Sequence, residues 1–412
     1  MINGFVITRK CESLMQKVLL VDDNPNVLYS FKRTLHSVSN QWIILTAESA
    51  ADALEIISHE SVDIIISDLR MPIMDGVTLL GIVANQSPST LRIAITGDAD
   101  PVLCQQATLV AHQFIAKPIE PQELTRIINQ AVGVSSLVMK ADVKKAILKI
   151  ANLPSQPSLY NQLLAELNKP DVDLDYLASV ISQDISMTAK ILQLVNSAYF
   201  GLAREVKEVS QAVFYLGVET IRDLSLSVHL FSQFDQALIA RSGLGNLWDH
   251  SLRVASCSRA IAASSISDKK IISGAFTAGL LHDIGKLILG TTAPDFYSSK
   301  KYLQVEDKFQ NLMQEKLEFG STHADIGAYL LGSWGLPQEI INAVLTHHSF
   351  ESQKRVEFTT SMAVWFANAY VCDFSNETNT NGFQPSDDML KNQALAPRLV
   401  SWNKACDQIL TK

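Results

Sequence analysis

Residues 68–76 read DLRMPIMDG and directly follow Val62–Ser67, an apolar stretch with the composition of a buried strand. Asp68 is therefore expected at the carboxyl end of that strand, where open α/β sheets place their reactive groups. A carboxylate exposed at this edge can be phosphorylated. The stretch predicts an α/β fold for the first part of the chain, with Asp68 as its reactive residue.

Other strand ends supply the groups that phosphoryl transfer requires. The transferred group carries negative charge, so it needs a divalent cation and fixed donors around its oxygens. One apolar run ends at Asp22 and Asp23, a carboxylate pair suited to an oxygen-preferring ion such as magnesium. Two later runs end at Thr96, a hydroxyl, and at Lys117, a cation. A single such residue is often a helix cap or solvated surface, but four successive strand ends indicate a site.

Strand-like and helix-like segments alternate through this part of the chain. This alternation is typical of β-α-β units and a parallel sheet. The expected strands are 18–23, 42–47, 62–68, 91–96 and 113–117.

Residues 16–133 resemble the receiver domain of two-component response regulators in all of these features. The resemblance implies a flavodoxin-like, five-stranded parallel sheet with helices on both faces. It also implies that a sensor histidine kinase or a phosphotransfer protein is the partner that phosphorylates Asp68.

The same resemblance assigns roles to single residues. Asp23 and Asp68 would bind Mg²⁺ directly, and Asp22 would act through water. The switch residues would be Thr96, Phe114 and Lys117, the last of which precedes Pro118.

The length of 412 residues predicts two to three domains. With 47% hydrophobic and 18% charged residues, the chain has the composition of a well-packed globular protein. The expected divisions are an N-terminal extension over 1–15, the receiver over 16–133, a helical connector over 134–150, an all-α domain over 151–375, and a flexible linker with a C-terminal helical tail over 376–412.

The charge argues against nucleic acid as a partner. The net charge is −8, and residues 17–133 hold 7 basic and 13 acidic side chains. A protein that binds a phosphate backbone needs a basic stripe, which neither part of the sequence offers.

The five cysteines and the hydropathy pattern bound the cellular setting. Cys11, Cys104, Cys257, Cys372 and Cys406 form no Cys-x-x-Cys pair, so free thiols are expected. No segment approaches the roughly 20 apolar residues of a membrane span. We expect a cytoplasmic protein without a membrane partner, and the sequence leaves a homodimer open.

Helical periodicity dominates after the receiver. Val134–Ile150 alternates lysines with aliphatic residues and is expected to be one amphipathic connecting helix. Two further amphipathic helices are expected at Leu174–Ser182 and Ile185–Val195, the second followed by a helix stop at Gly201.

Histidines and one acid carry the chemistry of this second part. Neutral imidazoles and a carboxylate are ligands for zinc, iron or manganese. The pair His282-Asp283 lies in an apolar run expected to be one helix, where an unpartnered polar pair would be costly to bury. Asp283 could bridge two ions, and Lys286 could contact a phosphate. The candidate ligands are His250, His282, Asp283, His323, His347 and His348.

Residues 149–375 resemble the HD superfamily of metal-dependent phosphohydrolases, and more closely its HDOD branch. The supporting stretches are Leu153-Pro154 with Pro157, Asn196-Ser197-Ala198, Leu216-Gly217, residues 279–286, His323 with Gly327, and residues 334–337.

Two departures from the enzymes of that superfamily bear on function. Asn368 stands where active members have a final aspartate ligand, and an amide is a weaker metal ligand than a carboxylate. The paired histidines are also not followed by the Gly-Tyr-Pro signature of cyclic-dinucleotide phosphodiesterases. We expect a non-catalytic output that regulates another signalling protein, such as a cyclic-di-GMP enzyme. The alternative is a regulated metal-dependent phosphohydrolase or phosphodiesterase acting on a nucleotide or a cyclic dinucleotide.

Overall fold

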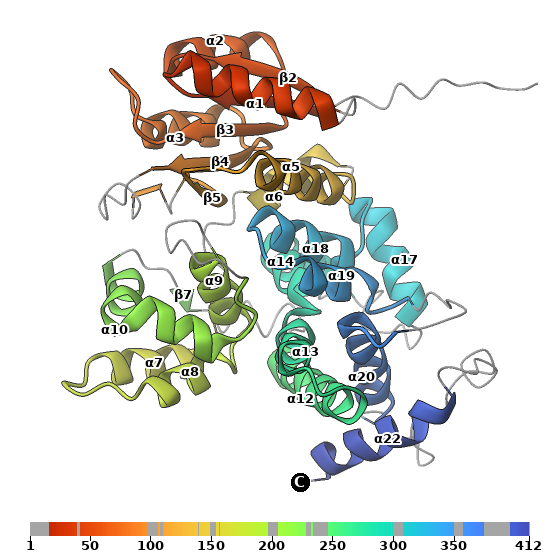
Figure 1. The fold of residues 1–412 in the computed structure, drawn as a ribbon. Coiled ribbons are helices and arrows are strands. Elements are labelled where there is room, and N and C mark those ends of the chain that lie inside the picture. Colours follow the sequence, from red (N-terminus) through yellow and green to blue (C-terminus); the bar gives the residue numbers. More distant parts are fainter. Residues whose placement is uncertain are drawn as a thin grey trace, which may run out of the picture. The chain divides into compact units, whose positions relative to one another are not determined.

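In the computed structural model, the chain folds into two compact units, one α/β and one helical (Figure 1). The structure describes residues 16–38, 42–97, 106–107, 110–138, 140–148, 154–155, 157–196, 205–227, 232–233, 246–297, 299, 308–349, 357–374 and 396–411.

The α/β unit is built on a five-stranded sheet in the order β2-β1-β3-β4-β5, as predicted. Neighbouring strands β1 and β2, β1 and β3, and β3 and β4 pair in parallel. Every residue of β3 is buried, which fits a parallel sheet covered on both faces. The strands are β1 Gln16–Val21, β2 Trp42–Ala47, β3 Ile64–Asp68, β4 Leu91–Thr96 and β5 Gln113–Ala116.

The core of this unit is a ladder of aliphatic side chains across the central strands. Leu20 pairs with Ile66, and Ile66 pairs with Ile93. All three side chains are almost fully buried. Parallel strands need crossover connections, and helices supply them around this sheet (Figure 1). These helices are α1 Pro25–Val38, α2 Ala50–His59, α3 Gly76–Gln86 and α5 Pro121–Ser135.

The sheet collects the polar strand ends at one edge. β1, β3 and β4 run in the same direction and end at Val21, Asp68 and Thr96. Asp22 and Asp23 follow β1 directly, and Lys117 follows β5. The carboxyl ends of the strands therefore carry the groups expected there.

The helical unit contains several packed groups of helices. Helices α7, α8, α9 and α10 pack together, and α12 packs on α13, α20 and α22. A third group joins α18 to α14 and α19. The elements are α6 Ala141–Leu148, β6 Pro154–Ser155, α7 Pro157–Leu167, α8 Leu174–Ile181, α9 Ile185–Val195, α10 Val209–Ser227, β7 Ser232–Gln233, α12 Leu247–Ser265, α13 Lys269–Leu281, α14 Ile284–Thr292, α15 Pro294–Tyr297, α17 Lys308–Phe319, α18 His323–Ser333, α19 Gln338–Thr346, α20 Thr360–Phe374 and α22 Ala396–Leu410.

The expectation of one continuous connecting helix over residues 134–150 was wrong. Helix α5 ends at Ser135, and α6 begins only at Ala141. The Ser136 hydroxyl donates to the carbonyl of Gly133 at 2.8 Å, a local bond that competes with helix continuation. The break allows Val138 to be fully buried.

The His282-Asp283 pair also lies in a different setting from the one expected. Helix α13 ends at Leu281 and α14 begins at Ile284, so the pair forms a junction instead of lying inside one helix. Lys269–Thr292 is the one described helical stretch with the length and composition of a membrane span. Its apolar window is 72% buried in the protein, as expected for core helices.

Two glycines let α14 and α18 cross closely near this junction. A Cβ atom on Gly285 would lie 1.9 Å from the carbonyl oxygen of His323. A Cβ atom on Gly327 would lie 3.0 Å from the Ile284 side chain. Because neither position has room for a side chain, the crossing brings Asp283 beside His323.

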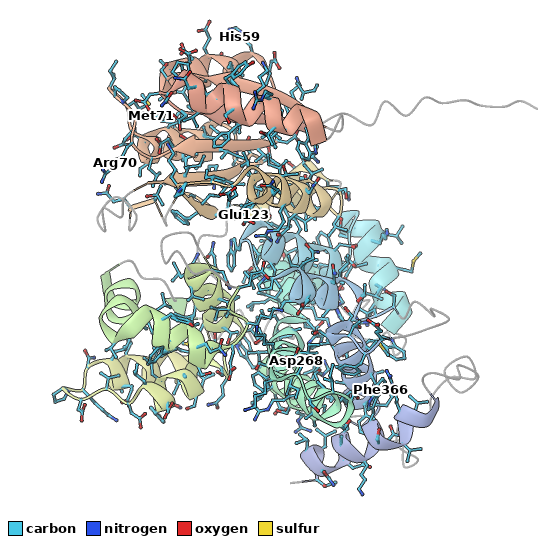
Figure 2. The ribbon with its side chains drawn as sticks, viewed as in Figure 1. His59, Arg70, Met71, Glu123, Asp268 and Phe366 are labelled. Atoms are coloured by element: carbon cyan, nitrogen blue, oxygen red, sulfur yellow. The ribbon has the colours of Figure 1, made fainter. Side chains whose placement is uncertain are left out.

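The C-terminal tail contributes to the core of the helical unit. Trp402 of α22 and Phe366 of α20 are fully buried, with ring centroids 5.2 Å apart. Figure 2 shows Phe366 among the packed side chains of this unit. Cys257, Cys372 and Cys406 are free thiols, as predicted. The expectations for residues 1–15, Cys11, Cys104, Gly201 and the linker after residue 375 lie outside the described residues.

Candidate functional site

The carboxyl edge of the sheet holds the first candidate site. Lys117 Nζ lies 2.7 Å from Asp68 Oδ2 and 2.8 Å from Asp22 Oδ2. Asp22 and Asp68 are largely buried, whereas Asp23 is exposed. Oxygen atoms of these three aspartates lie within 4.8 Å of one another. Two of the three predicted carboxylates thus contact the Lys117 ammonium group, and the third, Asp23, lies beside them.

The charges of this site stabilise one another. Burial works against the Lys117 ammonium, but its hydrogen bonds to Asp22 and Asp68, and their charges, outweigh burial and raise the pKa of Lys117. The lysine therefore stays cationic at neutral pH. It is placed to contact an anionic group on Asp68.

The loop after Asp68 is shaped by Gly76 at the start of α3. A Cβ atom on Gly76 would lie 2.1 Å from the carbonyl oxygen of Asp68, and the Gly76 amide donates to the carbonyl of Leu69 at 2.9 Å. Within the same loop, Ile73 has a left-handed φ of 71° and is fully exposed. Strain of this kind in a β-branched residue is uncommon and tends to occur at functional loops.

The remaining receiver residues lie on the expected strands. Thr96 is buried at the end of β4, on the same edge as Asp68. Phe114 is half-buried in β5. Their roles as switch residues stay predictions.

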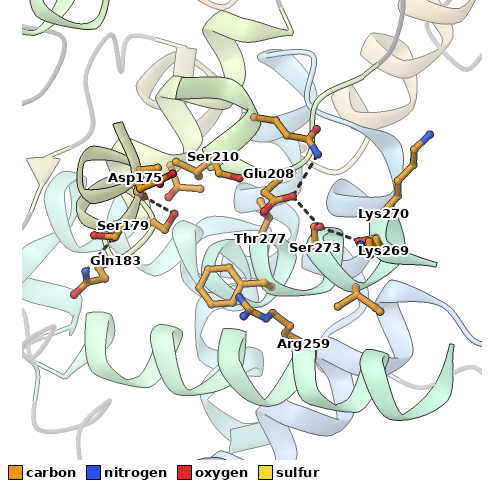
Figure 3. A pocket seen from close by; sticks show the side chains of 17 residues that line it. Asp175, Ser179, Gln183, Glu208, Ser210, Arg259, Lys269, Lys270, Ser273 and Thr277 are labelled. Atoms are coloured by element: carbon orange, nitrogen blue, oxygen red, sulfur yellow. Dashed lines mark hydrogen bonds between the residues drawn. The ribbon is translucent and has the colours of Figure 1, made fainter. Parts of the chain in front are cut away.

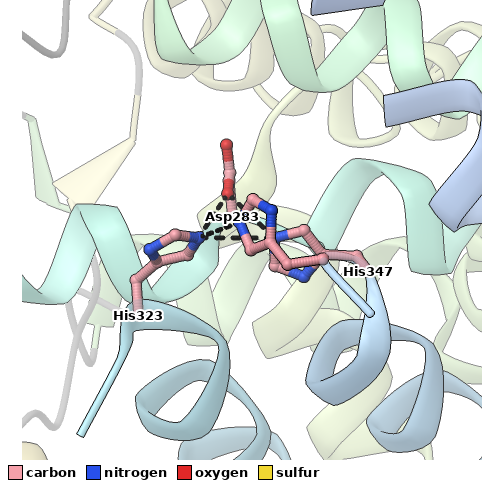
Figure 4. A group of neighbouring side chains, drawn as sticks. Asp283, His323 and His347 are labelled. Carbon is pink, nitrogen blue, oxygen red and sulfur yellow. Dashed lines mark hydrogen bonds and ion pairs between the residues drawn. The ribbon is translucent and has the colours of Figure 1, made fainter. Parts of the chain in front are cut away.

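The second candidate site is a cluster of histidines around Asp283. Oδ1 of Asp283 lies 3.2 Å from His323 Nε2 and 3.4 Å from His347 Nε2 (Figure 4). Oδ2 lies 3.2 Å from His282 Nε2 and 3.7 Å from His250 Nε2. One fully buried carboxylate therefore lies between two groups of imidazoles, as the expected bridging role requires.

Hydrogen bonds orient three of these imidazoles. Nδ1 of His282 lies 2.7 Å from the carbonyl oxygen of Gly279, and Nδ1 of His347 lies 2.6 Å from that of Val344. Since a carbonyl only accepts, both Nδ1 atoms must donate. With Nδ1 turned to a carbonyl, each ring directs its Nε2 atom toward the cluster, which is the arrangement of metal-ligating histidines.

The third imidazole is oriented by Glu315, a residue that the sequence reasoning missed. Glu315 is fully buried, and its Oε2 lies 2.7 Å from His323 Nδ1. It also accepts from the His323 backbone amide at 2.7 Å and from the Tyr297 hydroxyl at 2.8 Å. Burial opposes its charge, but His323 outweighs burial and lowers the pKa of Glu315 to about 2. Glu315 could have been noticed in the sequence as an acid on the same helical face as the apolar residues Leu312 and Phe319.

The spacing of the nitrogens fits a metal ion. His323 Nε2 lies 3.3 Å from His347 Nε2 and 2.9 Å from His348 Nε2, and the Nε2 atoms of His282 and His250 are 3.3 Å apart. Two imidazole nitrogens that bind one ion at about 2.1 Å lie roughly 3 Å from each other. Both His347 and His348 face the cluster.

A buried carboxylate oxygen without a hydrogen bond also fits a metal site. Asp283 Oδ1 is buried and accepts no hydrogen bond among the described residues, although two histidine nitrogens lie within 3.4 Å. Burial lowers the pKa of His347 to about 4 and, with His282 nearby, lowers that of His250 to about 3. Neutral imidazoles and an unpaired carboxylate oxygen are what a borderline metal needs.

Two neighbours modify the charge of the cluster. Asn368 of α20 has its Oδ1 3.2 Å from His250 Nε2, so the amide lies where the final acid was expected. Lys286 Nζ lies 2.7 Å from Asp283 Oδ2 and is held by it. Burial opposes the Lys286 charge, but Asp283 outweighs it and raises the pKa of Lys286.

Comparison with known families identifies both units. The family model of the response regulator receiver domain matches residues 18–129, and that of the HDOD domain matches residues 153–350. The chain is a response regulator. Its receiver domain contains the Asp68 site, and its HDOD domain contains the histidine cluster. A receiver domain implies a phosphodonor such as a kinase.

Curated relatives of this response regulator match parts of it. An uncharacterized protein of Treponema pallidum is 26% identical over 260 residues, which are 62% of this chain and 50% of the relative. The transcriptional regulatory protein GlrR of Escherichia coli is 32% identical over 134 residues, 32% of this chain and 29% of the relative. The response regulator thus spans at most half the length of these two relatives.

Solved structures also resemble the response regulator. The MmoQ response regulator of Methylococcus capsulatus has 26% identity and a TM-score of 0.48, and the match covers 62% of this chain and 93% of that one. The signal receiver domain of an HD domain-containing protein from Pseudomonas fluorescens has 33% identity and a TM-score of 0.28, covering 29% and 94%.

Proposed function

We propose that a kinase or phosphotransfer protein phosphorylates Asp68 and that this switches the HDOD domain, which regulates another signalling protein in the cytoplasm. The observation that carries the proposal is the Asp68 site, in which Lys117 lies within 2.8 Å of two buried carboxylates. A phosphoryl group on an Asp68 oxygen would replace the carboxylate as the partner of Lys117.

Magnesium fits the same site. Asp22, Asp23 and Asp68 offer oxygens within 4.8 Å of one another, the donor set that Mg²⁺ prefers. Asp23 and Asp68 would hold the ion directly, and Asp22 would act through water. The ion would neutralise charge on the transferred phosphoryl group.

The connector offers a physical route to the HDOD domain. The Ser321 hydroxyl donates to the carbonyl of Leu137 at 3.0 Å, and Lys140 Nζ donates to the carbonyl of Glu318. One contact falls on the last turn of α17 and the other on the turn that leads into α18, and these helices carry Glu315 and His323. Movement of the connector would therefore act on the histidine cluster.

A regulatory output is favoured by Asn368. Its neutral amide lies beside His250 and leaves that side of the cluster without a second carboxylate. Metal binding is thereby weakened relative to a site with an aspartate there. The regulated partner would be a signalling protein, such as an enzyme of cyclic-di-GMP metabolism.

The first test is phosphorylation of the full chain. Acetyl phosphate with magnesium should label the wild type and the surface control Glu55→Gln, but not Asp68→Asn. Affinity capture with and without phosphorylation should then yield a partner in one state only. Equal labelling of all three proteins would contradict the receiver mechanism, and identical captures would contradict the switch.

A second candidate function is metal-dependent hydrolysis of a nucleotide or cyclic dinucleotide. It is favoured by the convergence of four imidazoles on Asp283, three of which are oriented by hydrogen bonds from Nδ1. Iron, manganese or zinc held there would supply Lewis-acid chemistry. In such an enzyme, Asp283 and the histidines would bind the metal, and Lys286 would contact the substrate phosphate.

Metal analysis and turnover distinguish the two functions. The purified full chain should be analysed for iron, manganese and zinc and assayed against cyclic-di-GMP and nucleotides. Turnover that disappears in Asp283→Asn would establish the enzyme. Bound metal without turnover would support the regulatory output.

A further inference from the structure

A groove of about 630 Å³ lies in the helical unit, and no residue of the histidine cluster is among those that line it (Figure 3). Its walls come from α8 and α9, from the segment that opens α10, and from α12 and α13. Ligand sites for small molecules commonly enclose roughly 300–1,000 Å³. The groove therefore has room for a small organic ligand.

Three cationic residues contribute to the lining of the groove. Arg259 of α12 and Lys269 and Lys270 of α13 line it, and all three are exposed. No ion pair of these side chains is found among the residues that the structure describes. Free cations grouped at the rim of a concave site attract an anion, and guanidinium and ammonium groups are the usual partners of phosphate.

The interior of the groove offers an aromatic surface. Phe276 of α13 lines the groove and is half-buried, and the Arg259 guanidinium lies 5.7 Å from its ring centroid. Planar bases stack on aromatic rings and on guanidinium groups. The pair is thus suited to hold a flat heterocycle next to the cationic rim.

Hydrogen-bond acceptors complete the site. Glu208 lies 3.1 Å from the Ser273 hydroxyl, which shares its one proton with the Lys269 carbonyl at 2.8 Å, and it accepts from the Gln211 amide at 3.4 Å (Figure 3). Asp175 of α8 is the second carboxylate in the lining. Carboxylates in a site with three cations can accept from the amino group of a base or from sugar hydroxyls.

We propose that this groove binds a nucleotide. The phosphates would contact Arg259, Lys269 and Lys270, the base would stack at Phe276, and Glu208 would accept from the base edge. The inference goes beyond the proposed function, because it gives the HDOD domain an effector site of its own.

The groove is separate from the histidine cluster but lies on the same two helices. Arg259 follows His250 by nine residues on α12, and Ser273 of α13 precedes His282, which directly follows that helix, by nine residues, about 13 Å in each case. Between the two sites the helices touch, since a Cβ atom on Gly279 would lie 2.8 Å from Ala255 Cα. A ligand in the groove would therefore contact the same two helices, α12 and α13, that position His250 and His282.

The test is equilibrium dialysis of the full chain with labelled GTP and ATP, in a buffer with a chelator that removes metal from the histidine cluster. The variants are Arg259→Glu, the double variant Lys269→Glu with Lys270→Glu, and Phe276→Leu. Lys404→Glu reverses an exposed charge on α22 and serves as the matched control. Inorganic triphosphate and guanosine test which part of the ligand is recognised.

We expect saturable binding of at least one nucleotide to the wild type and to Lys404→Glu. Affinity should fall roughly ten-fold or more in the charge-reversal variants. Phe276→Leu should weaken nucleotides but not triphosphate. No binding by the wild type up to about 1 mM would overturn the proposal. Equal affinity in the groove variants, or triphosphate binding as tightly as the nucleotides, would overturn it too.

Discussion

His250 Nε2 lies 3.2 Å from Asn368 Oδ1 on the side of the cluster away from Glu315. The amide thus contacts His250 at the position where a second carboxylate would be a metal ligand. It supplies a dipole but no negative charge. The contact predicts that a single substitution at Asn368 would change the affinity of the proposed metal site.

Asn368→Asp should tighten metal binding. The new carboxylate would lie beside His250 and add an anionic ligand, so the affinity for zinc or manganese should rise by about ten-fold or more. Competition with a chelating dye measures the change. Asn342→Asp, the same chemical change at an exposed position on α19, should have no effect. An unchanged affinity in Asn368→Asp would show that this residue does not face the metal.

Glu315→Gln should weaken metal binding without removing any ligand. The carboxylate orients His323 through Nδ1 at 2.7 Å, and loss of such a partner typically lowers metal affinity by about 10- to 100-fold. Tyr297→Phe deletes one hydrogen bond to the same carboxylate but keeps its charge, so its effect should be smaller. Equal metal affinities in the two variants would contradict the expectation that Glu315→Gln has the larger effect. The chelator competition used for Asn368→Asp gives both values.

Lys190→Met should stabilise the protein at neutral pH. Burial lowers the pKa of Lys190 to about 8, although its ammonium lies 4.7 Å from the ring centroid of Trp334. In the unfolded chain the pKa is about 10.4, so the charge destabilises the fold by roughly 3 kcal/mol below pH 8.

The lowered pKa of Lys190 also determines how the free energy of unfolding depends on pH. Between pH 8 and about 10.4 the unfolded chain binds more protons at this residue, so wild-type stability rises with pH there. The advantage of Lys190→Met should shrink across that window. Denaturant unfolding at pH 7, 8.5 and 10 measures it, with Lys404→Met as the exposed control. A difference that does not vary with pH would refute the assignment.

Gly285→Ala should disrupt the helix crossing. The added methyl group would meet the carbonyl oxygen of His323 at 1.9 Å, and overpacking of this kind costs roughly 1–3 kcal/mol or more. Metal should be lost together with stability, because α14 and α18 must move apart. Gly133→Ala is the matched control, since among the described residues no atom outside its own helix backbone lies within 4 Å of its Cβ position, and alanine favours a helix. Thermal unfolding of both variants compares them.

Much of the fold followed from periodicity along the sequence. The five strands were predicted because apolar runs such as Leu91–Thr96 end in polar residues, and the structure confirms them. The connector was mispredicted because its lysine pattern continues past Ser136, while the chain bends there to bury Val138. Local propensity does not register such a tertiary contact.

The site shows the same division. All the predicted candidate ligands lie together in the structure. They could be predicted because each is a polar residue in or beside an apolar helical segment, where burial requires a partner. Glu315 was missed because its partner is a backbone amide and a ring nitrogen on another helix. The position of the His282-Asp283 pair at a helix junction likewise depends on a crossing of α14 and α18 that no spacing encodes.

The glycine crossing at Gly285 has a consequence for how the protein can change over time. At Gly285, the backbone of His323 is the limiting neighbour, so backbone contact there helps set the separation between α14 and α18. Substitutions among the aliphatic side chains elsewhere in the core can therefore alter stability while the spacing between these two residues is kept. The crossing keeps the separation between the two helices constant, so the residues of the cluster and the packing around it can evolve independently.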